Sequence, residues 1–179
     1  MSPTRQARFE ALFNEHYAAV HRYALRRAEA PLAEEVVNEA FLVAWRRLDE
    51  VPEEPLPWLY GTAKHVLANR RRDAARHARR IGAAAAESGA RDAARDPAER
   101  LAERDAALRA FTGLSEPDRE ALRLVAWERL SLAEAARAAG VSRPAFAMRV
   151  HRARRRLAAR LREQDAAVDL DFPLEPADA

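Results

Sequence analysis

The chain has 179 residues, 49% of them hydrophobic, and no cysteine. It has no run of about 18 apolar residues and no signal-peptide pattern after Met1, so we expect a cytoplasmic protein without membrane insertion, secretion or disulfides. The formal net charge is only +3, but basic and acidic residues are segregated along the chain, which is typical of binding to a charged partner.

Residues 1–81 are predicted to form a first small helical domain. Aromatic and aliphatic residues recur at helical spacing over 9–24, which predicts a helix with one buried face. Pro31 suits the first turn of a second helix, expected over about 32–48, whose apolar positions are too widely spread for a surface helix. This second helix is therefore predicted to lie at the centre of its domain.

The polar face of the second helix carries three carboxylates and an amide, from Glu34, Glu35, Asn38 and Glu39. Carboxylates near a helix N-terminus interact favourably with the helix dipole, which is one interpretation of the pattern. The other interpretation is an acidic docking patch for a basic partner. Periodicity alone does not separate the two.

A proline-rich loop over 51–57 is followed by Trp58, Tyr60 and a basic run. The arginines of the run are Arg70, Arg71, Arg72, Arg76, Arg79 and Arg80. Aromatic rings ahead of arginines suit single-stranded nucleic acid, because bases stack on the rings while the guanidinium groups bind the backbone. Burial of Trp58 with Leu59 in the core explains these residues equally well.

Residues 82–96 are poor in large apolar side chains and are predicted to be a flexible linker. Helix-start signals at Asp96 and Ser115 then predict a second domain over 97–162 with four helices. The predicted fold is therefore all-α, with two small helical domains joined by the linker. Residues 163–179 contain six acids and no base, and we expect them to form a disordered acidic tail.

The last two helices of the second domain form a helix-turn-helix pattern. Ser131 and Glu134 have the spacing of a capping box, in which each side chain bonds the other residue's backbone. Gly140 then ends the helix, because glycine readily takes the left-handed conformation, and Ser142 can cap the next helix. Two helices joined by a short turn with glycine are typical of DNA-binding proteins.

The second helix of the motif has an apolar seam and a basic opposite face. The seam consists of Phe146, Val150, Ala153, Leu157 and Leu161. Between Arg143 and Arg162 there are eight arginines and no acid, as phosphate binding requires. A solvated basic face is the alternative, since Lys64 is the only lysine and arginine is the default base of this chain.

The order of these pieces resembles the extracytoplasmic-function group of the bacterial sigma factors, which bring RNA polymerase to promoters. The residues that carry the resemblance lie at 33–45, 57–60, 114–122 and 131–154. The first stretch resembles the polymerase-clamp-binding helix of the family, and the second resembles the start of its −10 segment. The last two resemble its −35 domain.

Residue by residue, the resemblance implies three groups of contacts. The contacts with the basic clamp of the polymerase are assigned to Glu35, Asn38 and Glu39. A loop at Lys64 and His65 would capture an unstacked base of the −10 element. The residues assigned to the melted −10 strand are Trp58, Lys64, His65, Arg70 and Arg71. Those assigned to the duplex −35 element are Arg143, Ala147, Met148, Arg149, His151, Arg152 and Arg155.

Four positions depart from the family pattern. His65 stands where the family commonly has asparagine, which leaves the −10 sequence open. Gly61 stands where a helix former is usual, and it is expected to loosen that segment by about 1 kcal/mol. Ala147 and Met148 replace polar readers, which predicts sparse hydrogen-bond readout and a contribution from thymine methyl groups and DNA shape.

The resemblance implies a sigma factor that directs core RNA polymerase to a specific set of promoters and assists their opening at transcription initiation. The implied partners are core polymerase, promoter DNA and, as in the family, an anti-sigma protein. A helix-turn-helix regulator that acts without polymerase is the alternative. An enzyme finds little support, because the chain has no cysteine, no glycine-rich phosphate loop and only scattered histidines; no metal and no cofactor are predicted.

Overall fold

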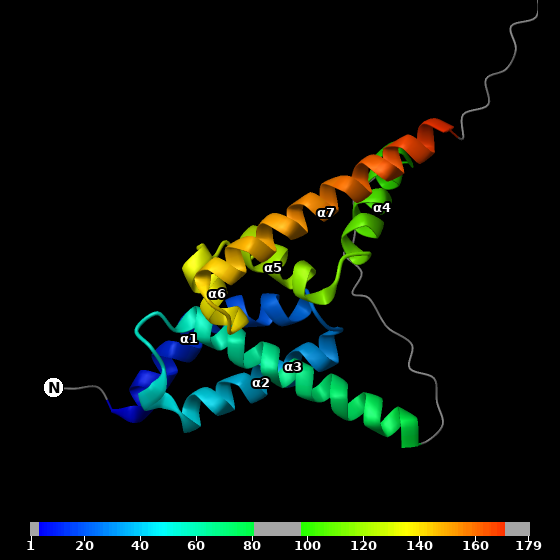
Figure 1. Ribbon diagram of the computed structural model, residues 1–179. Coiled ribbons are helices and arrows are strands. Elements are labelled where there is room, and N and C mark those ends of the chain that lie inside the picture. Colours follow the sequence, from blue (N-terminus) through cyan, green and yellow to red (C-terminus); the bar gives the residue numbers. More distant parts are fainter. Residues whose placement is uncertain (1–3, 81–97, 171–179) are drawn as a thin grey trace, which may run out of the picture. The chain divides into compact units, whose positions relative to one another are not determined.

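The computed structural model describes residues 4–80 and 98–170 (Figure 1). Within these residues the regular structure is helical and contains no strand, which confirms the predicted all-α class. The elements are α1 (Arg5–Leu25), α2 (Ala30–Arg46), the short 3-10 helix η1 (Leu48–Glu50), α3 (Pro55–Arg80), α4 (Ala98–Thr112), α5 (Glu116–Ala126), α6 (Leu132–Ala139) and α7 (Arg143–Leu170). None of the helices in this part of the chain is long and apolar enough to cross a membrane.

The helices form two compact units. The first contains α1, α2, α3 and α6, and the second contains α4, α5 and α7. From sequence, α4 to α7 were expected to share one domain over 97–162, whereas α6 groups with the first unit because it packs against α3. The predicted linker, residues 82–96, lies outside the described residues.

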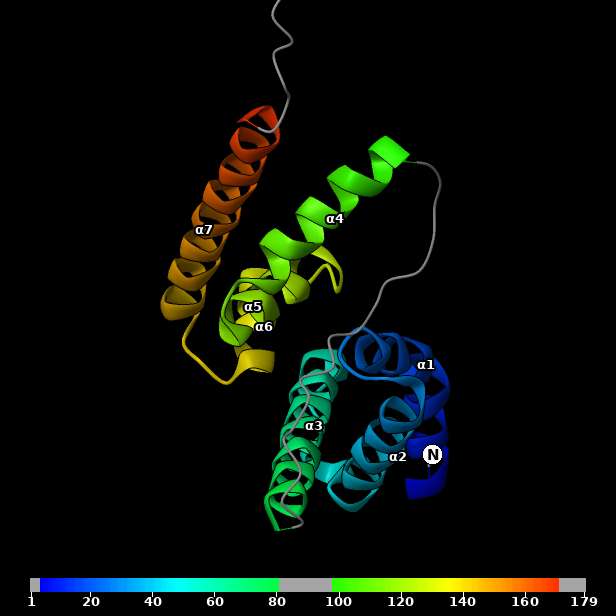
Figure 2. The same cartoon turned by 90° about the vertical axis from the view of Figure 1, so that its right-hand side faces the viewer.

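The first unit is built on α2, which packs against both α1 and α3 (Figure 2). The fully buried side chains of α2 are those of Ala33, Val36, Val37, Ala40 and Ala44. The alanines let the neighbouring helices approach closely, and each buried valine contributes about 1.5–3 kcal/mol. The expected central position of this helix is therefore confirmed.

The aromatic residues of α1 form one side of this core. The rings of Phe9, Phe13 and Tyr17 lie 6.5, 4.9 and 6.2 Å from the ring of Phe41 in α2, measured between centroids. Aromatic pairs at such distances contribute about 0.5–1.5 kcal/mol beyond the area that they bury. The aromatic periodicity of the sequence thus corresponds to a helix–helix contact.

Tyr60 of α3 belongs to the core rather than to an exposed nucleic-acid surface. Its ring stacks on that of Tyr23 in α1 with the centroids 4.6 Å apart, and only 3% of Tyr60 is exposed. The buried guanidinium of Arg27 lies 3.5 Å from the centre of the Tyr23 ring and donates to the Tyr23 carbonyl. A stacking role is therefore wrong for Tyr60, because its ring joins α3 to α1.

The second unit has a core of its own. Leu114, Leu122 and Ala153 are buried together, and Phe111 and Leu157 pack against them. These residues come from α4, from α5 and the turn before it, and from α7. The apolar seam predicted for α7 is thus the face that joins it to the rest of this unit.

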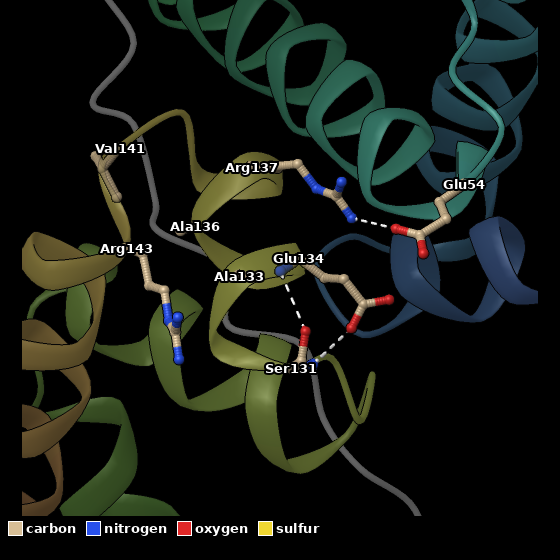
Figure 3. Close-up of a pocket in the computed structure, with 8 residues that line it drawn as sticks. All are labelled: Glu54, Ser131, Ala133, Glu134, Ala136, Arg137, Val141 and Arg143. Carbon is tan, nitrogen blue, oxygen red and sulfur yellow. Dashed lines mark hydrogen bonds and ion pairs between the residues drawn. The ribbon is translucent and has the colours of Figure 1, made fainter.

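The segment from α6 into α7 has the predicted cap and turn. Ser131 accepts a hydrogen bond from the backbone N–H of Glu134, and the Glu134 carboxylate accepts one from the backbone N–H of Ser131 (Figure 3). This reciprocal pair is the capping box expected from sequence. Gly140 follows α6 with a φ of 71°, the left-handed conformation that glycine takes without strain.

α7 continues beyond the expected end of the second domain. The helix runs to Leu170, so the prediction of disorder for residues 163–179 is wrong for 163–170. Five of its eight residues are glutamate, glutamine, alanine or leucine, the other three are two aspartates and a valine, and none is glycine or proline, so the stretch contains no residue that breaks a helix. Residues 171–179 lie outside the described part of the chain.

The capping box predicts a loss of stability on substitution of Ser131 with alanine. The free energy of unfolding should fall by about 1 kcal/mol, because α6 loses the acceptor for one of its first N–H groups. The hydrogen bonds from Ser131 also hold the pKa of Glu134 below its ordinary value of 4.5. Since the folded-state pKa is lowered, this contribution to stability is present above pH 4.5 and is lost as the pH falls through the folded-state pKa.

Urea unfolding of the full chain at neutral pH and at about pH 3 measures both effects. The difference between wild type and Ser131→Ala should be larger at neutral pH than at the acidic one. Ser131→Thr keeps the acceptor and is the matched control. Equal stability of wild type and Ser131→Ala at neutral pH would show that the cap contributes nothing.

Candidate nucleic-acid interface

Glu35, Asn38 and Glu39 form an acidic stripe on the side of α2 that remains accessible. Glu35 and Asn38 are exposed, and Glu39 is half-buried. The first turn of α2 contains no acid, and the helix dipole acts mainly on charges in the first turn. The dipole therefore does not account for the stripe, which favours the docking interpretation.

Arg70 of α3 joins the acidic stripe to the basic helix. Its guanidinium lies 3.0 Å from the Glu39 carboxylate and 3.9 Å from that of Glu35. Each of the three side chains is at least 40% exposed, so the two ion pairs contribute at most about 1 kcal/mol. From sequence these residues fall into two separate contact groups, whereas the structure brings them together.

Arg71, the next residue of α3, is also engaged within the protein. Its guanidinium donates to the carbonyl of Arg27, just past the end of α1. This bond attaches α3 to the end of α1. An arginine has five donors, so one bond to a carbonyl is compatible with a further contact to a phosphate.

Lys64 and His65 lie within α3, so the predicted loop at these two residues is wrong. The helix persists through Gly61 because it is held from the side by tertiary packing. Its buried residues at helical spacing are Leu59, Ala63, Val66 and Leu67. Burial of four such side chains outweighs the helix propensity that a single glycine costs, about 1 kcal/mol.

The other −10 candidates differ in accessibility. His65 is exposed on α3, whereas Lys64 is half-buried and donates to the carbonyl of Ala139 at 2.8 Å. Trp58 is half-buried, and the guanidinium of Arg47 lies 6.0 Å from the centre of its ring. The sequence left open whether Trp58 is a core residue or a ring on which a base stacks. Because it is half-buried, Trp58 can pack in the protein and still offer an accessible part to a base.

The candidate −35 face of α7 is exposed as the helical wheel predicts. Phe146, Val150 and Ala153 are at most 4% exposed, whereas Met148 on the opposite side is 55% exposed. Ala147 and Arg149 at the edges of the seam are half-buried. The exposed residues of this face are Arg143, Met148, His151, Arg152 and Arg155.

One arginine of α7 has a partner that the sequence did not predict. Arg156 donates to the carboxylate of Asp118 in α5, whose side chain is only 7% exposed. A buried carboxylate requires such a partner, because an unpaired charge in the interior is costly. Asp118 is 38 residues away in sequence, so a search of α7 for acids does not reveal the pair.

The described residues contain no group of three or more His, Asp or Glu side chains that could hold a metal ion. The described surface carries carboxylates on α2, arginines on α3 and α7, and the exposed Met148. Charged surfaces of this kind suit binding to charged macromolecules.

Two family models match the chain. Residues 12–77 match sigma-70 region 2, and residues 104–157 match sigma-70 region 4. The ECF RNA polymerase sigma factor SigL of Mycobacterium tuberculosis is 38% identical to the chain over 72 residues. That segment takes in 38% of this chain and 41% of SigL, so the match spans less than half the length of the relative.

Two solved structures have a similar fold. The sigma factor RpoE of Bartonella quintana, solved in complex with the anti-sigma factor NepR, is 24% identical with a TM-score of 0.68, over 86% of this chain and 96% of that chain. CnrH, solved in complex with the cytosolic domain of CnrY, is 24% identical with a TM-score of 0.53, over 94% of this chain and 92% of that chain.

The region 2 match takes in the acidic stripe and most of α3, and the region 4 match takes in α5, α6 and the exposed arginine face of α7. Together the two matches cover most of the chain. The chain therefore belongs to the sigma-70 family, and its similarity to SigL is to a member of the extracytoplasmic-function group.

Proposed function

We propose that this protein is a sigma factor that directs core RNA polymerase to a specific set of promoters and assists their opening. The observation that carries the proposal is the presence, in one chain, of an acidic stripe on α2 and an exposed arginine-rich face on α7. The first suits a basic protein surface and the second suits duplex phosphates. A chain with both can join a protein partner to DNA.

In this function the first unit has two tasks. The acidic stripe of α2 binds the basic clamp of the polymerase. The adjoining face of α3 binds the melted −10 strand, with Trp58, Lys64 and His65 near the extruded base and Arg70 and Arg71 on the backbone. Extruding a base costs a few kcal/mol, and the stacking and backbone contacts offset this cost.

α7 binds the duplex at the −35 element. Its exposed arginines bind phosphates, which sets the position of the helix in the major groove. Ala147 and Met148 offer no hydrogen bonds to base edges, so thymine methyl groups and DNA shape contribute to the choice of sequence. Most of the affinity is therefore electrostatic, and it should fall as the salt concentration rises.

The protein acts by binding, not as an enzyme, and it works in the cytoplasm together with the polymerase. An anti-sigma protein that masks the two faces is a further partner. The likeness to RpoE, which was solved in complex with an anti-sigma factor, supports this partner.

Sequencing of run-off transcripts tests the proposed function and identifies the promoters together. Core polymerase with this protein on genomic DNA should produce discrete transcript starts that share upstream motifs and that core polymerase alone does not produce. A helix-turn-helix regulator acting without polymerase would instead bind duplex DNA by itself and add no transcript start. That result would reject the sigma function.

Charge reversal of the acidic stripe should remove binding to the polymerase. Glu35→Lys with Glu39→Lys turns an attraction to the basic clamp into a repulsion, and co-purification with core polymerase should fall by roughly tenfold or more. Pull-down of core polymerase by the tagged full chain measures this. Glu10→Lys with Glu53→Lys, which reverses two exposed carboxylates outside α2, is the matched control.

A second control is needed because the reversal also breaks the ion pairs with Arg70. Arg70→Gln removes those ion pairs and leaves both carboxylates negative. It should retain the polymerase, whereas loss of binding in Arg70→Gln equal to that of the reversed protein would assign the effect to the ion pairs.

Arg152→Ala should weaken binding at the −35 element. Arg152 lies in the middle of the exposed face of α7, and loss of one such contact lowers the affinity by roughly tenfold. Transcription from a cognate promoter with an intact or a scrambled −35 element measures the effect. Arg154→Ala changes an exposed arginine on a different side of α7, and an equal loss in that variant would contradict the assigned face.

A further inference from the structure

Within the first unit, the short helix α6 packs against α3, and Gly61 makes this contact possible. A Cβ atom placed on Gly61 would lie 3.3 Å from the Ala138 carbonyl oxygen and 3.8 Å from the Ala138 Cα. The first distance is shorter than an ordinary contact between a Cβ and an oxygen. The absence of a side chain at Gly61 therefore lets the backbone of α6 reach α3.

Lys64 binds the end of α6, one turn further along α3. Its ammonium group donates to the carbonyl of Ala139 at 2.8 Å, and Ala139 is the last residue of α6. The final carbonyls of a helix have no partner within the helix, and a cation at that end also interacts favourably with the helix dipole. Lys64 thus acts as a partner for the C-terminus of α6.

An ion pair completes the contact at the other side of Gly61. Arg137 of α6 points toward Glu54, which precedes α3, and their side chains are paired (Figure 3). Both side chains are more than half exposed, so the ion pair helps to orient α6 on α3 but adds little stability. Glu54, Gly61 and Lys64 therefore hold α6 along the N-terminal half of α3.

We propose that α6 on α3 is a closed state in which the first helix of the helix-turn-helix blocks the melted-strand site around Lys64. This proposal rests on the proposed function, because Lys64 is a −10 contact only if the protein is a sigma factor. In the closed state the backbone of Ala138 and Ala139 occupies the space beside Lys64 that a captured base requires. Binding of the melted strand therefore requires α6 to leave α3.

The closed state opens through competition for Lys64. A strand phosphate is a charged acceptor and binds an ammonium group more strongly than a neutral carbonyl does. Of the other contacts, the ion pair between Glu54 and Arg137 is exposed and therefore weak. Release of α6 also frees Arg137 and Glu54 from their pairing.

A reducible cross-link tests the closed state in the full chain. The protein has no cysteine, so Glu54→Cys with Arg137→Cys introduces the only pair, at two exposed positions whose native side chains are in contact. A short bis-methanethiosulfonate reagent should join these two thiols readily. Glu54→Cys with Leu132→Cys, which moves the second thiol to an exposed position on another side of α6, is the matched control and should be joined at least tenfold more slowly.

The cross-linked protein should lose transcription with core polymerase and recover it when the cross-link is reduced. Two results would overturn the proposal: a cross-link that forms no faster than in the control pair, or a cross-linked protein as active as the reduced one. Failure of the proposed function has a different signature, since the wild-type chain would then give no transcript start with core polymerase whatever the yield of the cross-link.

Charge exchange provides a second test of the closed state. Glu54→Arg alone and Arg137→Glu alone should each lower the ratio of closed to open protein by about two- to fivefold, as expected for loss of an exposed ion pair. The double exchange should restore the ratio.

Because Lys64 is the only lysine, reductive methylation with a 13C label gives one lysine NMR signal. This signal should move toward that of a free lysine in the single variants and return in the double variant; an unchanged signal in both single variants would contradict the closed state.

Discussion

The first unit depends on the burial of α2 between α1 and α3. Three alanines and two valines of α2 have no contact with solvent, so the helix has little freedom to present more than one polar face; they are Ala33, Val36, Val37, Ala40 and Ala44. That face carries Glu35, Asn38 and Glu39. The packing that stabilises the unit therefore also determines where a basic partner can bind, and it places the arginines of α3 beside the same surface, where Arg70 pairs with two of its carboxylates.

α6 has a different kind of dependence. It has eight residues, and isolated helices shorter than about 12–15 residues are only marginally stable in water. Its helical state therefore rests on its two ends and on its neighbour: the capping box at Ser131, the left-handed Gly140, and the contact with α3. Because α6 needs a surface to pack on, it can leave α3 and stay helical only if another surface binds it.

The features that sequence predicts well are local ones. The capping box, the left-handed Gly140 and the seam of α7 follow from spacings of three to four residues, and the structure has all of them. The features missed depend on residues far apart. Tyr60 is in the core because of Tyr23, and Lys64 lies in a helix that burial sustains despite Gly61. The same holds for the partners of Arg70 and Arg156, which are 31 and 38 residues away; no periodicity within one helix reveals them.

The ion pair between Arg156 and the buried carboxylate of Asp118 also bears on the thermodynamics of DNA binding. A cation releases bound counterions from DNA only if its charge is available to a phosphate, and each such contact adds about 0.9 to the slope of log affinity against log salt concentration. The charge of Arg156 is already compensated inside the second unit. Duplex binding by α7 should therefore depend on salt less steeply than a count of its arginines implies, because one of them serves the fold.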